Sequence, residues 1–260
     1  MTQTQRRPHP LQIEDWKARV PSNNWLSEFQ RLGLMITNRR VLDIGCGMGY
    51  YGDLLAGAGA EIYGLDRQQE FVTAAASRRY RGVIRSNVTD MPVASSSFDL
   101  IYARYILHHI ARKQLCDVIE KIHRSLRHDG HLLIESTTPD LASRHHDVQI
   151  YPKLKRIIAS MYPSIESLTA LLRQAGFRII AFAETTQTRN PYPNVDSALE
   201  RSAALVSTGG GPTYWLQLSE AERKEFHEVR RNELVRLFGD GPVERQWSGY
   251  FLVAGKADTA

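Results

Sequence analysis

A glycine-rich stretch, VLDIGCGMGYYGDLL at residues 41–55, has the pattern of an apolar strand followed by a tight turn and the start of a helix. Glycine is needed in such a turn because the backbone must bend sharply and approach a ligand without a Cβ in the way. The glycines fit two templates and do not choose between them. Gly47, Gly49 and Gly52 match the dinucleotide fingerprint G-x-G-x-x-G, whereas Gly45, Gly47 and Gly49 match D-x-G-x-G-x-G, which begins at Asp43.

Two carboxylates bear on the choice of ligand. Asp43 lies inside the predicted strand, where its charge repels a pyrophosphate but can orient an amino group. Asp66 ends the next predicted strand, 21 positions after Gly45, and a carboxylate there can accept hydrogen bonds from both hydroxyls of a ribose. Because NAD sites and adenosyl sites share the second feature, only Asp43 favours an adenosyl ligand.

The next segment, SNVTDMPVASSSFDLIYARYILHHI at residues 86–110, has no counterpart in a dehydrogenase. With it the chain resembles the class I S-adenosylmethionine-dependent methyltransferases, and is similar to their small-molecule group of the ubiquinone and menaquinone type (type 11). The matching pieces, in order, are VLDIGCGMG, GLD, NVTDMPVASSSFDLIYARYILHHI and SLRHDGHLLIES, and LLRQAGFRII extends the match. The resemblance implies S-adenosylmethionine as the cofactor and methyl transfer as the reaction.

The resemblance also implies roles for single residues. The three glycines of D-x-G-x-G-x-G would lie against the methionine part of the cofactor, Asp66 would hold the ribose, and Asn87 with the Val88 amide would contact adenine. Arg104 would face the methionyl end, and there it could pair with the cofactor's carboxylate or with an acidic substrate. The expected cofactor-binding set is Asp43, Gly45, Cys46, Gly47, Gly49, Asp66, Arg67, Asn87, Val88 and Arg104.

Methyl transfer from a sulfonium needs alignment and exclusion of water, and it needs a general base only if the acceptor keeps its proton near neutral pH. The candidate catalytic residues are Tyr105, His108 and His109, just beyond the fourth predicted strand. Either histidine could instead bond a backbone carbonyl. The run from His145 to Asp147 resembles a metal-ligand set, but adjacent histidines do not share a helix face and nothing nearby completes a site, so no metal is expected.

Short apolar segments alternate with amphipathic stretches, which predicts a mostly parallel sheet covered on both faces. The expected strands are 41–45, 61–66, 82–86, 98–103, 131–136, 177–183 and 248–256. The resemblance adds that the last strand is antiparallel. The fold class is therefore α/β, a doubly wound, seven-stranded, mostly parallel Rossmann-like sheet with a helical N-terminal segment and a helical cap insert.

Two regions depart from this alternation. Residues 1–38, which contain Trp16 and Trp25, predict one or two helices. A long insert before the last strand contains helical patterns at 194–206 and 218–238, separated by GGGP at 209–212. We expect an N-terminal segment (1–38), a cofactor-binding core (39–183), a substrate cap over the sheet's carboxyl edge (184–247) and a last strand with its tail (248–260). A helical hairpin packed elsewhere for stability is the alternative for the insert.

The composition favours a cytoplasmic enzyme of small molecules. No apolar run approaches the roughly 18 residues of a membrane span, and the chain has two cysteines, Cys46 and Cys116, expected to be reduced. The net charge of +5 includes a basic run, RRYRGVIR at 78–85, but no RNA-binding module accompanies it, so a nucleic-acid partner is unlikely on the sequence alone. We expect a small organic methyl acceptor and a monomer or homodimer. The alternatives are an RNA or protein methyltransferase and a non-methylating S-adenosylmethionine-binding protein.

Overall fold

Seven strands form one sheet in the order β3-β2-β1-β4-β5-β7-β6 within residues 25–207 and 213–257, the part of the chain that the computed structural model describes. The strands are β1 (Arg40–Ile44), β2 (Glu61–Asp66), β3 (Gly82–Arg85), β4 (Phe98–Arg104), β5 (Leu126–Ser136), β6 (Phe177–Tyr192) and β7 (Val243–Lys256). The first five run parallel, and β7 lies antiparallel between β5 and β6. The predicted doubly wound, mostly parallel sheet is confirmed.

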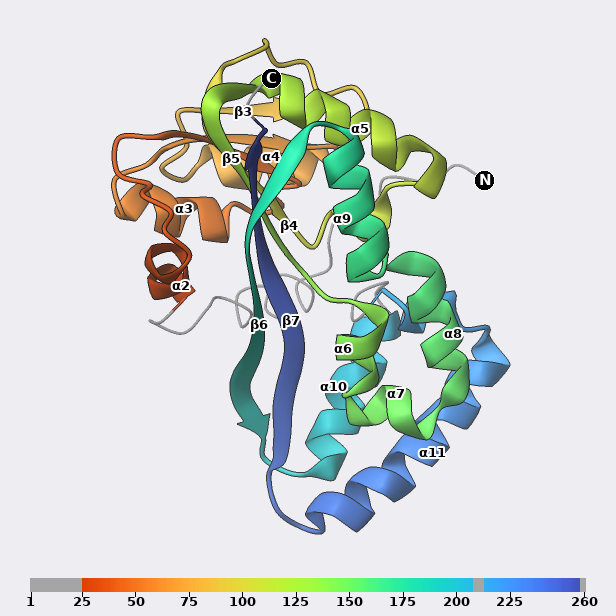
Figure 1. Ribbon diagram of the computed structural model, residues 1–260. Helices are drawn as coiled ribbons and strands as arrows, with labels where there is room; N and C mark the ends of the chain where they lie inside the picture. The colour runs from red at the N-terminus through yellow and green to blue at the C-terminus, as the bar shows by residue number, and fades with distance from the viewer. Residues whose placement is uncertain (1–24, 208–212, 258–260) are drawn as a thin grey trace.

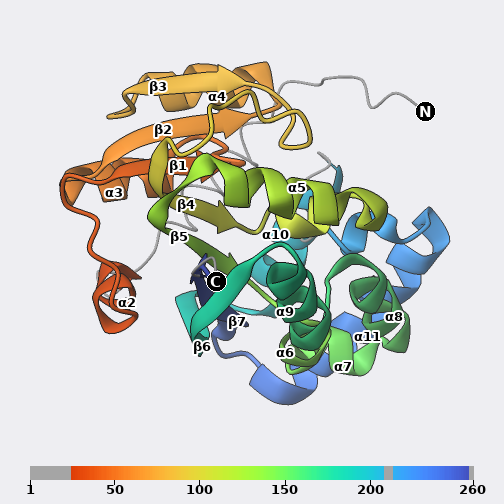
Figure 2. The same cartoon turned by 45° about the horizontal axis from the view of Figure 1, so that its top comes forward.

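Helices follow the strands and cover both faces of the sheet. They are α2 (Trp25–Arg31), α3 (Tyr50–Gly57), α4 (Gln69–Ala76), α5 (Arg112–Ser125), α6 (Pro139–Ser143), α7 (His146–Ile150), α8 (Pro152–Met161), α9 (Ile165–Gln174), α10 (Val195–Ser207) and α11 (Glu220–Phe238), with short 3-10 turns η1 (Leu107–His109) and η2 (Trp215–Gln217). Apolar residues of α5 and α9 pack on one face of the sheet, where Figure 2 shows α5 crossing β4 and β5. Apolar residues of α2 and α3 pack on the other face.

Two helices have capping residues at their ends. Ser164 accepts a hydrogen bond from the Ser167 backbone at the start of α9, and Gly176 follows that helix with a φ of 89°. Ser219 and Glu222 form a complete capping box at the start of α11. The helix α11 therefore begins within two residues of the helical pattern predicted at 218–238.

The last two strands are longer than predicted. β6 and β7 pair with each other from Phe177↔Lys256 out to Tyr192↔Val243, and Figure 1 shows them as a long two-stranded arm that extends beyond the rest of the sheet. Residues 184–192 and 243–247, expected within the helical insert, are therefore strand. Their polar residues gave no sign of this, because the pairing of one strand with the other creates the structure.

A helical lobe lies beside this arm (Figure 1). It contains α10 and α11 from the insert, together with α6, α7 and α8, which follow β5 in the chain. An apolar cluster that includes Tyr151, Leu154, Trp215 and Phe226 joins α8 to α11. Trp16, most of the expected N-terminal segment and the GGGP break lie outside the described residues. Among the described helices, none is both long and apolar enough to cross a membrane.

Candidate cofactor and acceptor sites

A cavity of about 240 Å³ lies at the carboxyl ends of β1, β2 and β3, which is where ligands bind in open α/β sheets. We call it the glycine-lined cavity. Six of the ten residues predicted to bind the cofactor line it: Gly45, Gly47, Asp66, Arg67, Asn87 and Val88. The sequence thus predicted most of the residues at the base of this cavity. Other lining residues, such as Phe71 and Gln114, belong to no motif that would have predicted them.

The turn between β1 and α3 gives this cavity its open floor. Gly45, Gly47 and Gly49 have φ angles of 71°, 53° and 77°, in the left-handed region that favours glycine. A Cβ added to Gly47 would meet no atom within 4 Å, so it would project into open space. A ligand can therefore approach the Gly47 backbone closely, as the cofactor implied by the sequence requires.

Asp66 is held in place by this same turn. Its Oδ2 accepts the Gly47 N–H at 3.0 Å, and its Oδ1 accepts the Gln68 N–H at 2.9 Å. Each carboxylate oxygen can accept a further hydrogen bond, so both remain able to bind ribose hydroxyls. Burial raises the pKa of Asp66, and the two backbone hydrogen bonds oppose that shift. The side chain is buried, fixed and part of the cavity wall, as a ribose-binding carboxylate should be.

Tyr80 decides between the two glycine templates. Its ring lies behind the turn, where a Cβ on Gly49 would come within 2.9 Å of the ring and a Cβ on Gly52 would overlap the hydroxyl. Gly52, the third glycine of the dinucleotide fingerprint, therefore makes room for a tyrosine of the protein, and it does not line the glycine-lined cavity. The match to the dinucleotide template is thus explained by packing.

Asp43 and Cys46 also lie behind the turn and outside the cavity wall. Asp43 accepts a hydrogen bond from the Tyr80 hydroxyl at 2.7 Å, and burial raises the pKa of Asp43 to about 7. Burial likewise raises the pKa of the Cys46 thiol, which disfavours its use as a nucleophile. These two predicted cofactor residues, with Gly49, support the turn from behind in this structure.

A second cavity, of about 290 Å³, lies between the end of β4 and the helical lobe, and we call it the aromatic chamber. The residues that line it include Tyr105, Tyr162, Tyr192, Tyr214, Trp215 and Trp247, with His108, His109, His145 and His146. Ser202 and Leu205 of α10 and Arg230 of α11 contribute as well. The insert helices and the β6–β7 arm therefore build one side of a chamber of the size and apolar character of small-molecule sites.

The two cavities meet at Tyr105 and His109, which line both. Tyr105 has a φ of 45°, an uncommon conformation for a bulky residue and one often found at functional sites. Its hydroxyl oxygen accepts a hydrogen bond from the Trp247 indole at 3.0 Å. Burial raises the pKa of Tyr105, so its hydroxyl stays protonated at neutral pH. Tyr105 is consequently suited to donate a hydrogen bond and poorly suited to act as a base.

The two predicted catalytic histidines both face the chamber, with their ring centroids 4.0 Å apart. Burial lowers the pKa of His108 to about 3, and it lowers the pKa of His109 as well. Nε2 of His108 lies 3.4 Å from the Thr213 hydroxyl, and its ring stacks on Tyr162. Both rings are therefore neutral at pH 7, and His109, at the junction of the cavities, is the better placed to accept a proton.

Arg104 lines the aromatic chamber and is absent from the wall of the glycine-lined cavity. Its Nε lies 3.1 Å from Oε1 of Glu135, whose side chain is fully buried. Glu135 also accepts hydrogen bonds from Trp25, Tyr102 and Gln187. The partners of Glu135 are thus side chains from three separate elements, α2, β4 and β6.

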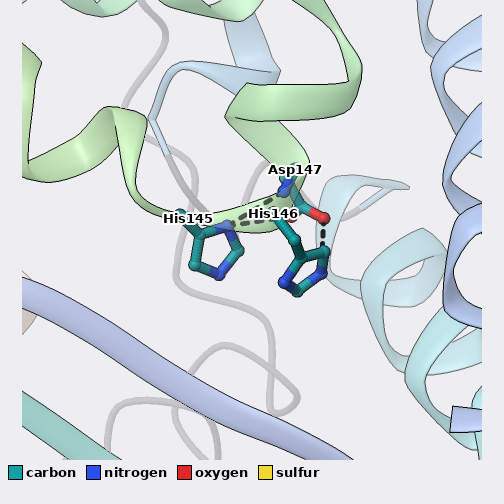
Figure 3. A group of neighbouring side chains, drawn as sticks. All are labelled: His145, His146 and Asp147. Atoms are coloured by element: carbon teal, nitrogen blue, oxygen red, sulfur yellow. Dashed lines mark hydrogen bonds and ion pairs between the residues drawn. The ribbon is translucent and has the colours of Figure 1, made fainter. Parts of the chain in front are cut away.

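The group His145, His146 and Asp147 lies at the start of α7 (Figure 3). Its potential ligand atoms lie within 4.8 Å of one another, a spacing that a metal ion could use. However, Nε of Arg230 already contacts Oδ1 of Asp147 at 2.8 Å, and Nε2 of His146 lies 2.9 Å from the same oxygen. A dication would face a guanidinium on its only carboxylate, so the arrangement favours an ion-pair network, and the absence of a metal stays a prediction.

Comparison with known proteins agrees with the geometry. Residues 42–134 match the family described as "Methyltransferase domain". The chain contains a class I S-adenosylmethionine-dependent methyltransferase domain. The putative methyltransferase from an antibiotic biosynthesis pathway of Anabaena variabilis shares the fold of this methyltransferase domain, with a TM-score of 0.63 over 90% of this chain and 98% of that one, at 17% identity.

Two curated relatives differ in what their names say of the acceptor. The tRNA U34 carboxymethyltransferase of Trichlorobacter lovleyi is 29% identical over 188 residues, which cover 68% of this chain and 56% of that protein. A probable S-adenosylmethionine-dependent methyltransferase of Mycobacterium tuberculosis is 29% identical over 154 residues, which cover 59% and 54%. The chain spans about half the length of the curated relatives it matches.

The site residues that had no signal in the sequence come from elements far away along the chain. Trp247 and Gln187 come from the β6–β7 arm, and Trp25 comes from α2. None stands in a motif. Only the structure shows that they meet at the end of β4.

Proposed function

We propose that the chain binds S-adenosylmethionine in the glycine-lined cavity and transfers its methyl group to a small organic acceptor in the aromatic chamber. The observation that carries this proposal is the meeting of the two cavities at Tyr105 and His109. A methyl group can pass between two bound molecules only where their sites adjoin, because the displacement is in line over a short distance.

The residues of the glycine-lined cavity fit this cofactor. Asp66 would hold the ribose hydroxyls, the Gly47 backbone would lie against the methionine part, and Asn87 with Val88 would contact adenine. Arg67 lines the same wall. When bound, S-adenosylmethionine supplies an electrophilic methyl group on a sulfonium that departs as a neutral thioether. The protein has therefore mainly to orient the two reactants and keep water out.

The aromatic chamber supports a small and partly aromatic acceptor. Tyr214 and Trp247 have nearly parallel rings, 11° apart, with centroids separated by 6.1 Å. Trp215 also lines the chamber, and its buried Nε1 has no hydrogen-bond partner among the described residues. A ligand with an oxygen acceptor would satisfy that donor. We assign residues 184–247 the role of an acceptor-binding insert on these grounds.

Two residues at the junction would act on the acceptor. His109, neutral at pH 7, would take the proton of a hydroxyl or phenol acceptor as the methyl group arrives. Tyr105 would donate a hydrogen bond that orients the acceptor, because Trp247 already donates to its oxygen. His108 would orient His109 by ring contact. An amine acceptor that binds in its neutral form would need neither proton transfer.

The test is acceptor-dependent release of S-adenosylhomocysteine from S-adenosylmethionine. A panel of small phenols, catechols, hydroxyquinones and amines is compared with bulk tRNA and with unfolded protein. The proposal predicts turnover with one or more small acceptors, and loss of that turnover in His109→Gln or Asp66→Asn. Tight cofactor binding without turnover on any acceptor would point to a non-methylating protein.

An RNA acceptor is the second candidate. The relatives named for tRNA support it, as do the exposed arginines Arg81 and Arg85 in the basic run. Against it, Arg79 and Arg78 of the same run pair with Asp53, which neutralises part of the charge. Turnover on tRNA with a steep loss of binding at higher salt would establish this candidate in place of a small acceptor.

A further inference from the structure

We propose that Arg104 binds a carboxylate of the methyl acceptor, so that the aromatic chamber takes a small aromatic carboxylic acid. This inference rests on the proposed function, because it names the substrate class of the same chamber. Arg104 lies at the end of β4, and its side chain is 18% exposed. It lines the aromatic chamber and does not line the glycine-lined cavity.

The guanidinium of Arg104 is ion-paired on one edge. Its Nε faces the buried Glu135, and Glu135 is itself fixed by hydrogen bonds from Trp25 at 3.2 Å and Gln187 at 2.9 Å. The Arg104 Cζ lies 3.7 Å from the centroid of the Tyr51 ring and 5.1 Å from that of Tyr105. An arginine restrained by a carboxylate and two rings is preorganised, so little freedom is lost when it binds a ligand.

The other edge is available. The ion pair with Glu135 uses Nε, and no hydrogen bond joins the terminal nitrogens of Arg104 to a described residue, although they can donate four. Two parallel N–H donors on one edge of a guanidinium match the two oxygens of a carboxylate. The free edge of Arg104 is therefore suited to bind a planar anion.

The remaining charges of the chamber favour a single negative charge. Arg230 is engaged by Asp147 at 2.8 Å and by Ser202 at 3.1 Å, and burial keeps His108 and His109 neutral. Glu244 lies at an exposed position of the wall. Arg230 is thus already paired with a buried carboxylate, whereas the terminal donors of Arg104 have no such partner among the described residues. One guanidinium suits a carboxylate better than a phosphate dianion, which would leave charge unbalanced.

The carboxylate that binds Arg104 could also be that of the cofactor's amino-acid part. Arg104 lines the chamber with Tyr105 and Trp247 and is not part of the wall that contains Gly47 and Asp66. The placement favours the acceptor as the source. The rings of Tyr105 and Trp247, which line the same chamber, add the preference for a flat, aromatic frame beside the carboxylate.

The experiment uses two matched probes on the protein loaded with S-adenosylhomocysteine: 4-hydroxybenzoate and 4-hydroxybenzamide, followed by NMR titration. We expect the acid to bind more tightly than the amide, by about 10-fold or more, because a charge-assisted pair is worth roughly 1.5–3 kcal/mol. Arg104→Gln should remove that preference and leave the amide unaffected. Arg104→Lys should retain part of it, and Arg144→Gln, at a surface pair with Glu184, should change nothing.

Cofactor binding separates the two sources. Calorimetry with S-adenosylhomocysteine and with 5′-deoxy-5′-methylthioadenosine, which lacks the amino-acid part, is run on the same variants. An unchanged affinity of Arg104→Gln for S-adenosylhomocysteine supports the proposal. A selective loss of S-adenosylhomocysteine affinity, with methylthioadenosine binding unchanged, would assign Arg104 to the cofactor and overturn it.

Two further results bear on the proposal. Equal binding of the acid and the amide to the unmodified protein, or no binding of either at millimolar concentration, would overturn it while S-adenosylhomocysteine still binds. A protein that fails to bind S-adenosylhomocysteine at all would instead overturn the proposed function. If Arg104→Gln does not fold because Glu135 is left unpaired, the double variant Arg104→Gln with Glu135→Gln removes both charges and gives the same readout.

Discussion

The indole N–H of Trp247 donates a hydrogen bond to the hydroxyl oxygen of Tyr105 at 3.0 Å, although 142 positions separate the two residues. The bond joins β7 to the residue that follows β4, where the two cavities meet. A Cβ on Gly249 would lie 2.9 Å from the same hydroxyl, so that glycine leaves room for the tyrosine. The oxygen is occupied by Trp247, and its proton is therefore free to point toward a ligand.

Tyr105→Phe should slow methyl transfer without weakening the cofactor. We expect kcat to fall by about 10- to 100-fold, since a hydrogen bond that orients the acceptor is worth roughly 1.5–3 kcal/mol when it involves a charged partner. Trp247→Phe should also lower kcat, by a smaller factor than Tyr105→Phe. The dissociation constant of S-adenosylhomocysteine, measured by calorimetry, should stay within about 2-fold of the unmodified protein, because the substitution keeps the ring that lines the glycine-lined cavity and removes only the hydroxyl. Tyr63→Phe, on β2, is the matched control, and a weaker cofactor affinity in Tyr105→Phe would contradict this role.

His109→Gln should change the pH dependence of the reaction on a hydroxyl acceptor. Because burial lowers the pKa of His109, the ring is neutral at pH 7 and becomes protonated, and unable to accept a proton, only at lower pH. The rate of the unmodified enzyme should therefore fall only once the pH drops below the ordinary histidine value near 6.5. The variant should lose about 100-fold or more in kcat together with that acid limb. An unchanged pH profile in the variant would show that another group accepts the proton.

Gly52 and Tyr80 should be strongly coupled in stability. Gly52→Ala forces a methyl group against the Tyr80 hydroxyl, so we expect a loss of about 1–3 kcal/mol from overpacking. The same change in a Tyr80→Leu background should cost much less, because the obstructing hydroxyl is gone. Urea unfolding of the four proteins gives the coupling energy. Additive effects would mean that Gly52 is needed for another reason, such as contact with a ligand.

Asp147 and Arg230 should stabilise the contact between α7 and α11. Removing one partner of a buried pair leaves an unpaired charge, so Arg230→Met should lower the free energy of unfolding by about 3–5 kcal/mol. The double change Arg230→Met with Asp147→Asn should recover part of that loss. Chemical unfolding monitored by circular dichroism measures both.

The same pair sets a pH dependence. Despite burial, Arg230 and the neighbouring histidines hold the pKa of Asp147 well below its usual range. In the unfolded chain the group titrates near 3.9, so acid protonates the unfolded state first. Stability from this group is present above about pH 4 to 5 and is lost as the pH falls further. Asp147→Asn should flatten that acid loss, and a parallel decline in both proteins would contradict the assignment.

The core of the fold could be predicted because its signals are local. The apolar runs at β1, β2 and β4 lie within one residue of their predicted bounds, and the capping residues Ser164 and Ser219 mark real helix starts. Asp66 and Gly47 could be assigned to one site, since the carboxyl ends of neighbouring parallel strands meet at one edge of a sheet.

The remainder depends on contacts that no local pattern encodes. The polar outer halves of β6 and β7 form strand only because they pair with each other. Tyr80 stands in a basic run, and nothing in its neighbours indicates that it fills the space behind Gly49 and Gly52. Trp247 reaches Tyr105 through the antiparallel register of β7. Each of these residues has its role because of where the fold places it, and none belongs to a recognisable motif.

The most direct test of the account is calorimetric titration of the unmodified protein and of Asp66→Asn with S-adenosylhomocysteine and with NAD. We expect S-adenosylhomocysteine to bind the unmodified protein and NAD not to, and we expect the substitution to weaken binding by about 10-fold or more, as for the loss of charge-assisted hydrogen bonds. Binding of NAD in place of S-adenosylhomocysteine, or equal affinity of both proteins for S-adenosylhomocysteine, would contradict the assignment of the glycine-lined cavity to an adenosyl cofactor.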